Sequence, residues 1–250
     1  MRLHHDDRAV RNVIGFTLTF SIILVSVGLV TTLGVGQLES ISQNERVENG
    51  QQAMELIATN FQQLERQQAT VQVNELDLSG GSLTVVDGPA VTVRSTQNFN
   101  RTIDVRALEY EVGETTFTYE NGALFRTDSR ENSVLLSDPQ LTCTPRRAVV
   151  SVVTIGAGSD SHFDGGAVTV SGTSTSQELL FPMNRTGTDS AGDAEEANLT
   201  VASPRIGAWD RYLSDSGNWT RSDALDDTYV CAGVEAVYVR RTVISVSFQT

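Results

Sequence analysis

The longest apolar run in the chain covers residues 13–35, twenty-three residues without a charged side chain. A helix rises about 1.5 Å per residue, so this run spans about 34 Å, enough for a bilayer core of about 30 Å. The pattern therefore predicts a transmembrane helix over residues 13–36. The run is longer than the apolar part of a secretory signal peptide, and no small-residue cleavage pattern follows it. We expect the helix to be retained.

A second periodic pattern follows directly, over residues 37–69, which contain no proline. Apolar residues return there at steps of three and four, as in an amphipathic helix. They are Val47, Met54, Ile57, Phe61 and Leu64. The pattern predicts that one helix continues from the membrane. Its apolar stripe packs either against its own domain or against neighbouring copies of the chain.

Beyond residue 70 the pattern changes to short β-branched runs with turn residues between them. Strands are predicted at residues 71–78, 82–86, 91–94, 148–155, 168–170, 179–181, 199–201 and 244–248. The pairs Gly80-Gly81 and Gly88-Pro89 are predicted to break the first three. Asn121-Gly122 predicts a hairpin between residues 115–119 and 123–127, because both turn positions tolerate positive φ.

One short helix is predicted within this β-rich part. Ser203-Pro204 starts an amphipathic pattern that ends near Gly217, and its aromatic residues are interpreted as core. Residues 156–166 and 185–197 are predicted loops. The expected fold class is α+β, with a cytoplasmic leader (1–12), a transmembrane helix (13–36), an amphipathic helix (37–69) and a β-rich extracellular domain (70–250).

The charges beside the apolar run predict its orientation. The segment before it carries three arginines, Arg2, Arg8 and Arg11. The segment after it carries three glutamates and one arginine, Glu39, Glu45, Glu48 and Arg46. Cytoplasmic flanks carry the excess of basic residues, so we expect a single-pass protein with its N-terminus inside and its C-terminal domain outside the cell membrane.

The composition is strongly acidic, with 31 acidic residues against 18 arginines, no lysine and a formal net charge of −13. Such a charge disfavours nucleic acid as a partner. Acid excess without lysine is typical of proteins in molar salt, where the Debye length is about 3 Å and self-repulsion is screened. We interpret the source as halophilic; an ordinary acidic secreted protein is the alternative.

Three groups of residues are candidate structural or modification sites. Cys143 and Cys231 both follow the membrane segment and are predicted to form a disulfide, with two free buried thiols as the alternative. Four sequons are candidate N-glycosylation sites, at Asn100, Asn184, Asn198 and Asn218, although chance alone would give about two to three in a chain of this composition. A small-residue stripe predicts close helix packing, at Gly28, Thr32 and Gly36, although membrane helices are rich in such residues anyway.

Catalytic patterns are weak. Asp160, His162 and Asp164 alternate as metal ligands can, but their spacing does not match a calcium loop, and a solvated acidic turn is the favoured interpretation. A serine or cysteine nucleophile outside the cell would need His162, and no nucleophile motif surrounds any serine. We therefore expect no catalytic residue, no metal site and no cofactor, and so no enzyme.

The segment RAVRNVIG, residues 8–15, resembles the N-terminal region of archaeal type IV pilins. The string ERVEN, residues 45–49, is similar to a segment of haloarchaeal pilin-like membrane proteins that carry a β-rich outer domain. The resemblance implies a precursor whose leader is removed by a prepilin peptidase. Its apolar helix would then pack with other pilin-like subunits in a filament. The alternative is a monomeric, permanently anchored surface binding domain.

Overall fold

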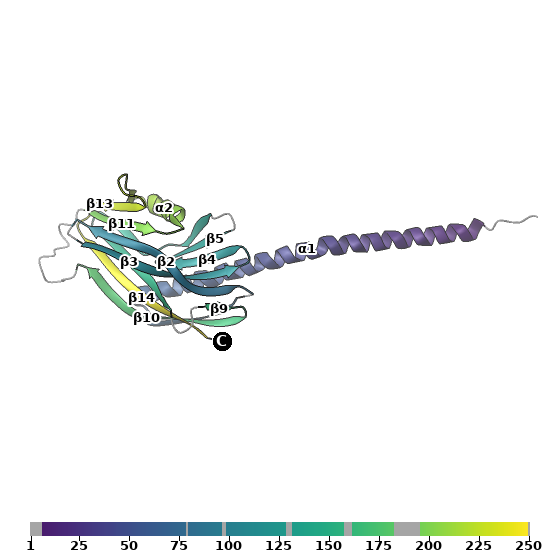
Figure 1. Cartoon of the computed structure of the whole chain (residues 1–250), viewed down its shortest axis with the longest axis horizontal. Helices are drawn as coiled ribbons and strands as arrows, with labels where there is room; N and C mark the ends of the chain where they lie inside the picture. The colour runs from purple at the N-terminus through teal and green to yellow at the C-terminus, as the bar shows by residue number, and fades with distance from the viewer. Residues whose placement is uncertain are drawn as a thin grey trace, which may run out of the picture. The chain divides into compact units, whose positions relative to one another are not determined.

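The computed structural model describes residues 7–78, 80–96, 99–128, 132–157, 162–182 and 196–249, and in the first helix the side chains of residues 14–31 and 41–65. The chain starts with α1 (Asp7–Glu65), a helix of 59 residues, and continues as a β-rich domain (Figure 1). The predicted succession of a long helix and a β-rich domain is confirmed. Contacts divide the chain into two units, residues 1–46 and 47–250, so the boundary falls inside α1.

The first of two sheets has five strands. Its order is β1 (Val71–Asp77), β10 (Ala167–Phe181), β14 (Val237–Gln249), β8 (Arg147–Ala157) and β7 (Leu141–Thr144). β14 and β8 pair in parallel, and the other neighbours are antiparallel.

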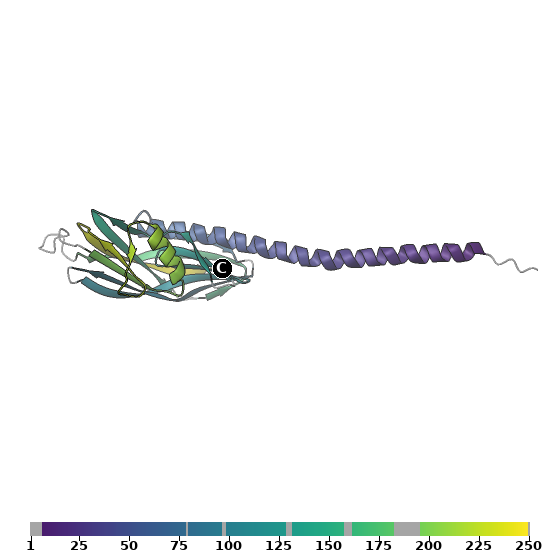
Figure 2. The same cartoon turned by 90° about the horizontal axis from the view of Figure 1, so that it is seen from above.

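The second sheet has nine strands. Its order is β12 (Thr220–Arg221), β13 (Thr228–Ala232), β11 (Glu196–Ala202), β2 (Ser82–Ser95), β3 (Phe99–Val112), β4 (Thr115–Glu120), β5 (Ala123–Thr127) and β6 (Ser133–Ser137), and β9 (His162–Asp164) pairs with β2. The sheet curls, so that α2 (Ile206–Asp215) contacts both β6 and β12, the two ends of this order (Figure 2).

Two apolar clusters form the core, and β8 contributes to both. Val150 and Val152 belong to the cluster that includes Trp209 of α2. Val153 and Ile155, which point to the opposite side of the strand, belong to the cluster that includes the C-terminal part of α1. This explains why residues 148–155 form a run without the polar alternation of a half-buried strand, as predicted for a strand buried on both faces.

The end of α1 has a defined capping geometry. The Gln68 amide donates to the Gln63 carbonyl and the Gln67 amide to the Leu64 carbonyl, while Gln67 has a φ of 61°. These two bonds and the left-handed residue constitute a Schellman motif, which satisfies carbonyls that the helix leaves free. The helix therefore ends at Glu65 without a glycine or proline, close to the predicted limit at residue 69.

Several strand predictions are confirmed, and others are wrong. Residues 168–170 and 179–181, predicted as separate strands, both belong to β10. Asn121 and Gly122 have φ values of 48° and 81° and connect β4 to β5 as predicted. The predicted break at Gly88-Pro89 is wrong, because β2 continues through it with a register shift between Asp87 and Ala90. A bulge accommodates proline, which has no N–H for the ladder, without ending the strand. In addition, the predicted loop 156–166 contains the short strand β9.

The predicted disulfide is present between Cys143 and Cys231, whose Cα atoms are 5.9 Å apart. Cys143 lies on β7 of the five-stranded sheet and Cys231 on β13 of the nine-stranded sheet. The bond therefore links the two sheets across 88 residues of sequence.

Candidate functional site

The most prominent surface of residues 1–46 is an apolar stretch of α1. Residues Ile14–Thr31 are long and apolar enough to cross a membrane, and none of that window is buried. Phe16, Val25 and Val30 are 73%, 68% and 69% exposed. An apolar surface that surrounds a helix over 18 residues is costly in water, so it requires cover by lipid or by other apolar helices.

The polar groups in this stretch are compatible with an apolar environment. Thr19, Ser26 and Thr31 each donate a hydroxyl hydrogen bond to a backbone carbonyl three or four residues earlier, at 2.8–2.9 Å. A hydroxyl that is bonded within its own helix avoids the cost of an unsatisfied donor in hydrocarbon. The window also contains no ionisable residue.

The next part of α1 is buried in residues 47–250. Met54, Ile57, Phe61 and Leu64 are fully buried, and Val47 packs against the same cluster. The stripe therefore packs against its own domain, the first of the two alternatives that the sequence left open. A close approach also fixes the helix, because a Cβ on Gly172 of β10 would lie 2.5 Å from Cε1 of Phe61.

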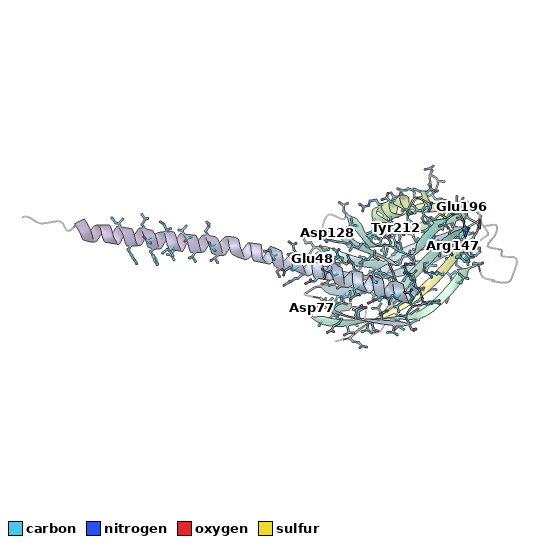
Figure 3. The ribbon with its side chains drawn as sticks, turned by 180° about the vertical axis from the view of Figure 1, so that it is seen from behind. Glu48, Asp77, Asp128, Arg147, Glu196 and Tyr212 are labelled. Carbon is cyan, nitrogen blue, oxygen red and sulfur yellow. A yellow bond between two sulfur atoms is a disulfide. The ribbon has the colours of Figure 1, made fainter. Side chains whose placement is uncertain are left out.

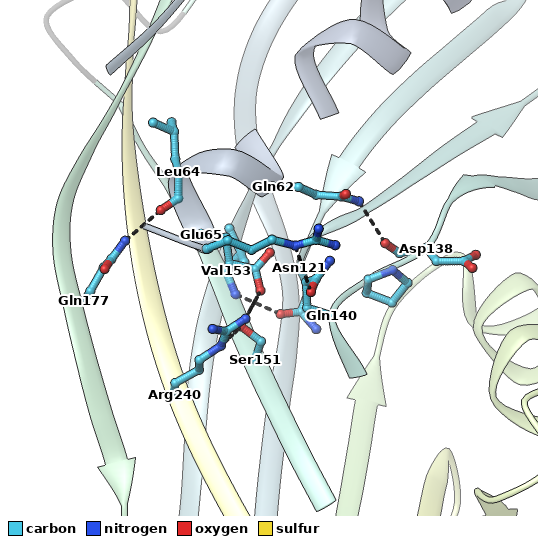
Figure 4. Close-up of polar contacts among 12 residues, drawn as sticks. Gln62, Leu64, Glu65, Asn121, Asp138, Gln140, Ser151, Val153, Gln177 and Arg240 are labelled. Atoms are coloured by element: carbon cyan, nitrogen blue, oxygen red, sulfur yellow. Dashed lines mark hydrogen bonds and ion pairs between the residues drawn. The ribbon is translucent and has the colours of Figure 1, made fainter. Parts of the chain in front are cut away.

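Glu65 joins the end of α1 to two neighbouring strands (Figure 4). Its Oε1 accepts a hydrogen bond from the Ser151 hydroxyl and pairs with Arg240 Nη2 at 3.1 Å. Arg240 Nε also donates to Ser151 Oγ at 2.8 Å. Ser151 on β8 and Arg240 on β14 are register partners, so pairing of the two strands assembles this site. Gln177 of β10 adds a bond from Nε2 to the Leu64 carbonyl at 2.7 Å.

Glu65 is only 2% exposed as a residue, and its side chain is fully buried. Burial raises its pKa above the ordinary value of 4.5, while the Ser151 hydroxyl and the Arg240 guanidinium pull the pKa partly back. The same burial raises the pKa of the Tyr119 hydroxyl, which the Glu65 charge raises further. This chemistry serves to hold α1 in place, because Glu65 is buried and its Oε1 is bonded to Ser151 and Arg240.

A second buried carboxylate holds α2. Glu120 is fully buried, and its Oε1 accepts hydrogen bonds from Trp209 Nε1 at 2.8 Å and from Ser203 Oγ at 2.7 Å. Its Oε2 lies 3.2 Å from Arg205 Nε, and the same arginine pairs with Glu109. Trp209 is fully buried, which confirms that this aromatic residue of the predicted helix belongs to the core.

His162 takes part in a chain of side-chain contacts on the surface. Its Nδ1 lies 2.7 Å from Thr84 Oγ1, and its Nε2 lies 2.8 Å from Asp164 Oδ2. A hydroxyl, imidazole and carboxylate in this order also occur in hydrolases. Here the imidazole and carboxylate are 52% and 73% exposed, so water screens them, and the contacts mainly attach β9 to β2. Asp160, the third residue of the predicted pattern, lies outside the described residues.

The other predicted site residues are placed as follows. Asn100 and Asn218 are exposed and Asn198 is half-buried, whereas Asn184 lies outside the described residues. Gly28 lies in the apolar stretch of α1, while the side chain of Thr32 and the surroundings of Gly36 lie outside the description. Within the described residues, no group of three or more histidine, cysteine or acidic side chains is arranged to hold a metal ion.

Sequence reasoning did not find the two buried carboxylates. Glu65 and Arg240 are 175 residues apart, and Glu120 and Trp209 are 89 apart. No local pattern indicates such partners, and a glutamate at the end of an amphipathic helix normally indicates a solvated position.

Comparison with known families gives one match. A family model described as a family of unknown function, DUF7289, matches residues 8–250. Comparisons with curated proteins and with solved structures found no match. The match covers both the apolar part of α1 and the β-rich domain.

Proposed function

The chain belongs to the DUF7289 family, whose function is unknown, so its function is inferred from its own structure. We propose that it is a pilin-like, non-enzymatic surface protein anchored in the cell membrane. Residues 14–31 of α1 would lie in the bilayer or among the equivalent helices of other subunits. The β-rich domain would face the medium.

A single observation carries this proposal. One continuous helix exposes all of its apolar surface over Ile14–Thr31 and buries its apolar stripe over residues 47–65. The second part is already covered by its own domain, whereas the first part is an apolar surface that remains for lipid or for partners. This division supports an anchor that is joined directly to a folded domain.

Two further features support an extracellular domain. Basic residues are concentrated before the apolar stretch, at Arg2, Arg8 and Arg11, which favours a cytoplasmic N-terminus. The Cys143–Cys231 disulfide is of the kind that persists in oxidising compartments outside the cytoplasm. Both features agree with the resemblance of residues 8–15 to archaeal pilins.

The mature N-terminus tests the pilin-like assignment. The chain would be extracted from the membranes of the cells that produce it, and its intact mass and N-terminal sequence would be determined. Removal of the charged leader close to residue 8 supports processing by a prepilin peptidase. Retention of residues 1–8 in every copy contradicts the processed-pilin assignment.

The alternative is a monomeric anchored binding domain, and the buried stripe of α1 favours it. The apolar stripe of residues 47–65 is covered within the chain and offers no contact to another subunit. Unless the β-rich domains also touch one another, subunits would contact each other through residues 14–31. Electron microscopy of the producing cells, with wild type and Gly28→Leu, separates the two assignments. Filaments that Gly28→Leu shortens or abolishes support assembly, and unchanged membrane levels without filaments support the monomer.

A further inference from the structure

Three of the predicted sequons come together on one face of the nine-stranded sheet. Asn100 on β3 pairs in register with Arg94 on β2, and Arg94 pairs with Asn198 on β11. Asn198 pairs in turn with Val230 on β13, which pairs with Thr220 on β12. Thr220 is the third residue of the sequon that begins at Asn218. Sequence segments that lie more than 90 residues apart therefore form one row across five strands.

The row lies on the outer face of the sheet. Asn198 stands between Ala197 and Leu199, which are both fully buried, so its side chain points away from the core. Asn100 and Asn218 are exposed. In the two sequons that lie within strands, the asparagine and the threonine are two residues apart and therefore share this face.

The asparagine side chains of the row are not used in holding the fold. Across the described residues, the amides of Asn100, Asn198 and Asn218 make no hydrogen bond to the protein. By contrast, Asn60 donates to Asn74, and the side chain of Asn121 accepts the Val153 amide at 3.1 Å. The sequon asparagines are thus free to carry a substituent without loss of an internal contact.

We propose that Asn100, Asn198 and Asn218 carry N-linked glycans that cover this end of the outer face. This inference rests on the extracellular placement of the domain proposed above. In each reaction Nδ2 forms a bond to C1 of a sugar donated by a lipid-linked sugar phosphate. The C1–O bond to the phosphate breaks, the phosphate leaves with the electron pair, and the amide loses one proton to solvent.

The geometry allows all three glycans to be present together. Neighbouring strands are about 4.8 Å apart, so Asn100 and Asn198, two strands apart, are separated by about 10 Å. The sequon threonines are bonded in the folded sheet, because Thr102 contacts Thr92 and Thr200 contacts Thr228, each at 2.8 Å between hydroxyl oxygens.

The row has a definite place within residues 47–250. Glu196, which starts β11 two residues before Asn198, lies at the opposite end of this unit from Glu48 and Asp77 (Figure 3). Glu48 belongs to the part of α1 that enters the unit. Glycans on the row would keep this end of the outer face free of protein contacts and leave the end near Glu48 uncovered.

Peptide mass spectrometry of the full-length chain from its native membranes tests the proposal. The chain contains no lysine, and cleavage after arginine places each sequon on its own peptide: residues 95–101, 148–185, 186–205 and 212–221. We expect sugar mass on peptides 95–101, 186–205 and 212–221. Thr102→Ala should remove it from peptide 95–101 alone, whereas Thr102→Ser, which retains the sequon, should not.

Protease treatment of intact producing cells separates this inference from the proposed function. If the domain is cleaved from outside and the three peptides are unmodified, the glycan inference is wrong and the extracellular placement stands. Sugar on peptide 148–185 alone, which carries Asn184, also contradicts the proposal that Asn100, Asn198 and Asn218 are the glycosylated residues. If the domain is protected and unmodified, the extracellular placement fails and the inference fails with it.

Discussion

Glu65 occupies the end of a helix where the macrodipole disfavours a carboxylate. Arg240 offsets this with its positive charge, and Ser151 donates a hydrogen bond to the same oxygen. Removing one partner of a buried pair leaves the other uncompensated, whereas the pair as a whole contributes little net stability. The contact therefore contributes more to which strands the end of α1 meets than to how stable the domain is.

The raised pKa of Glu65 makes stability depend on pH. Between about pH 4.5, where the unfolded chain loses the Glu65 proton, and the raised pKa of the folded chain, only the folded chain keeps that proton. The site's contribution is therefore greatest below that range, and the free energy of unfolding falls as pH rises through the folded-state pKa. We expect Glu65→Gln to remove this decline, which amounts to about 1.4 kcal/mol per unit of pKa difference.

Chemical unfolding of the detergent-solubilised chain at several pH values measures this effect, with tryptophan fluorescence as the signal. Trp209 and Trp219 are both buried and report on unfolding. Glu48→Gln, an exposed substitution on the same helix, is the matched control and should leave the pH dependence unchanged. Parallel pH profiles for wild type and Glu65→Gln would show that burial does not raise this pKa.

Gly172 is a second position at which a single atom matters. A Cβ there would lie 2.5 Å from Phe61 Cε1, and the Phe61 ring is held by Tyr119 in an edge-to-face contact with centroids 5.3 Å apart. Since the ring is fully buried, it cannot move without disturbing the core. Gly172→Ala should therefore lower the free energy of unfolding by about 1–3 kcal/mol.

Gly207→Ala is the matched control for this substitution. Gly207 lies in α2, and an added Cβ there meets nothing within 4 Å. The better helix propensity of alanine should leave stability unchanged or raise it by up to about 1 kcal/mol. Equal stability losses in the two variants would contradict the proposed contact between β10 and α1.

Among the elements, the disulfide is the covalent cross-link that joins the two sheets in addition to the backbone. It joins β7 to β13 and closes a loop of 88 residues. Cross-linking a loop of this length stabilises a protein by about 2–5 kcal/mol, largely through the unfolded chain. We expect Cys143→Ser with Cys231→Ser to lower the unfolding midpoint in denaturant by a corresponding amount. A double variant as stable as wild type, measured without reductant, would show that the bond is absent or without effect.

Local patterns predicted the elements whose signals are contained in neighbouring residues. The long helix, the Asn121-Gly122 hairpin and the final strand, with buried Ile244, Val246 and Phe248, follow directly from periodicity and turn chemistry. The strand β3 was missed, because Asp104, Arg106 and other polar residues on its outer face conceal the apolar alternation. The break at Gly88-Pro89 was wrong because the strand's neighbours, which hold it through a bulge, are not visible in the sequence.

The site was predictable only where a motif marks it. The apolar anchor, the cysteine pair and the sequons were found from residue type and spacing. The row that the sequons form, and the contacts of Glu65 and Glu120, depend on strand order and register between distant segments. A single sequence does not contain that information in a local form.

For the whole molecule, the decisive question is what covers residues 14–31 of α1. Placing an arginine at the centre of a membrane helix costs about 2.5–3.5 kcal/mol, and it also prevents close packing among apolar helices. Leu24 is 56% exposed in the middle of the stretch and belongs to the unit of residues 1–46, not to the unit of residues 47–250. Leu24→Arg should therefore weaken anchoring while the domain remains folded.

The most direct test is the partition of full-length wild type, Leu24→Arg and the control Leu24→Ile after an alkaline wash of membranes from producing cells. The account predicts that wild type and Leu24→Ile stay in the membrane pellet, while a large fraction of Leu24→Arg is released or fails to insert. Release of wild-type chain into the supernatant, or equal retention of all three chains, would contradict the claim that residues 14–31 anchor the protein.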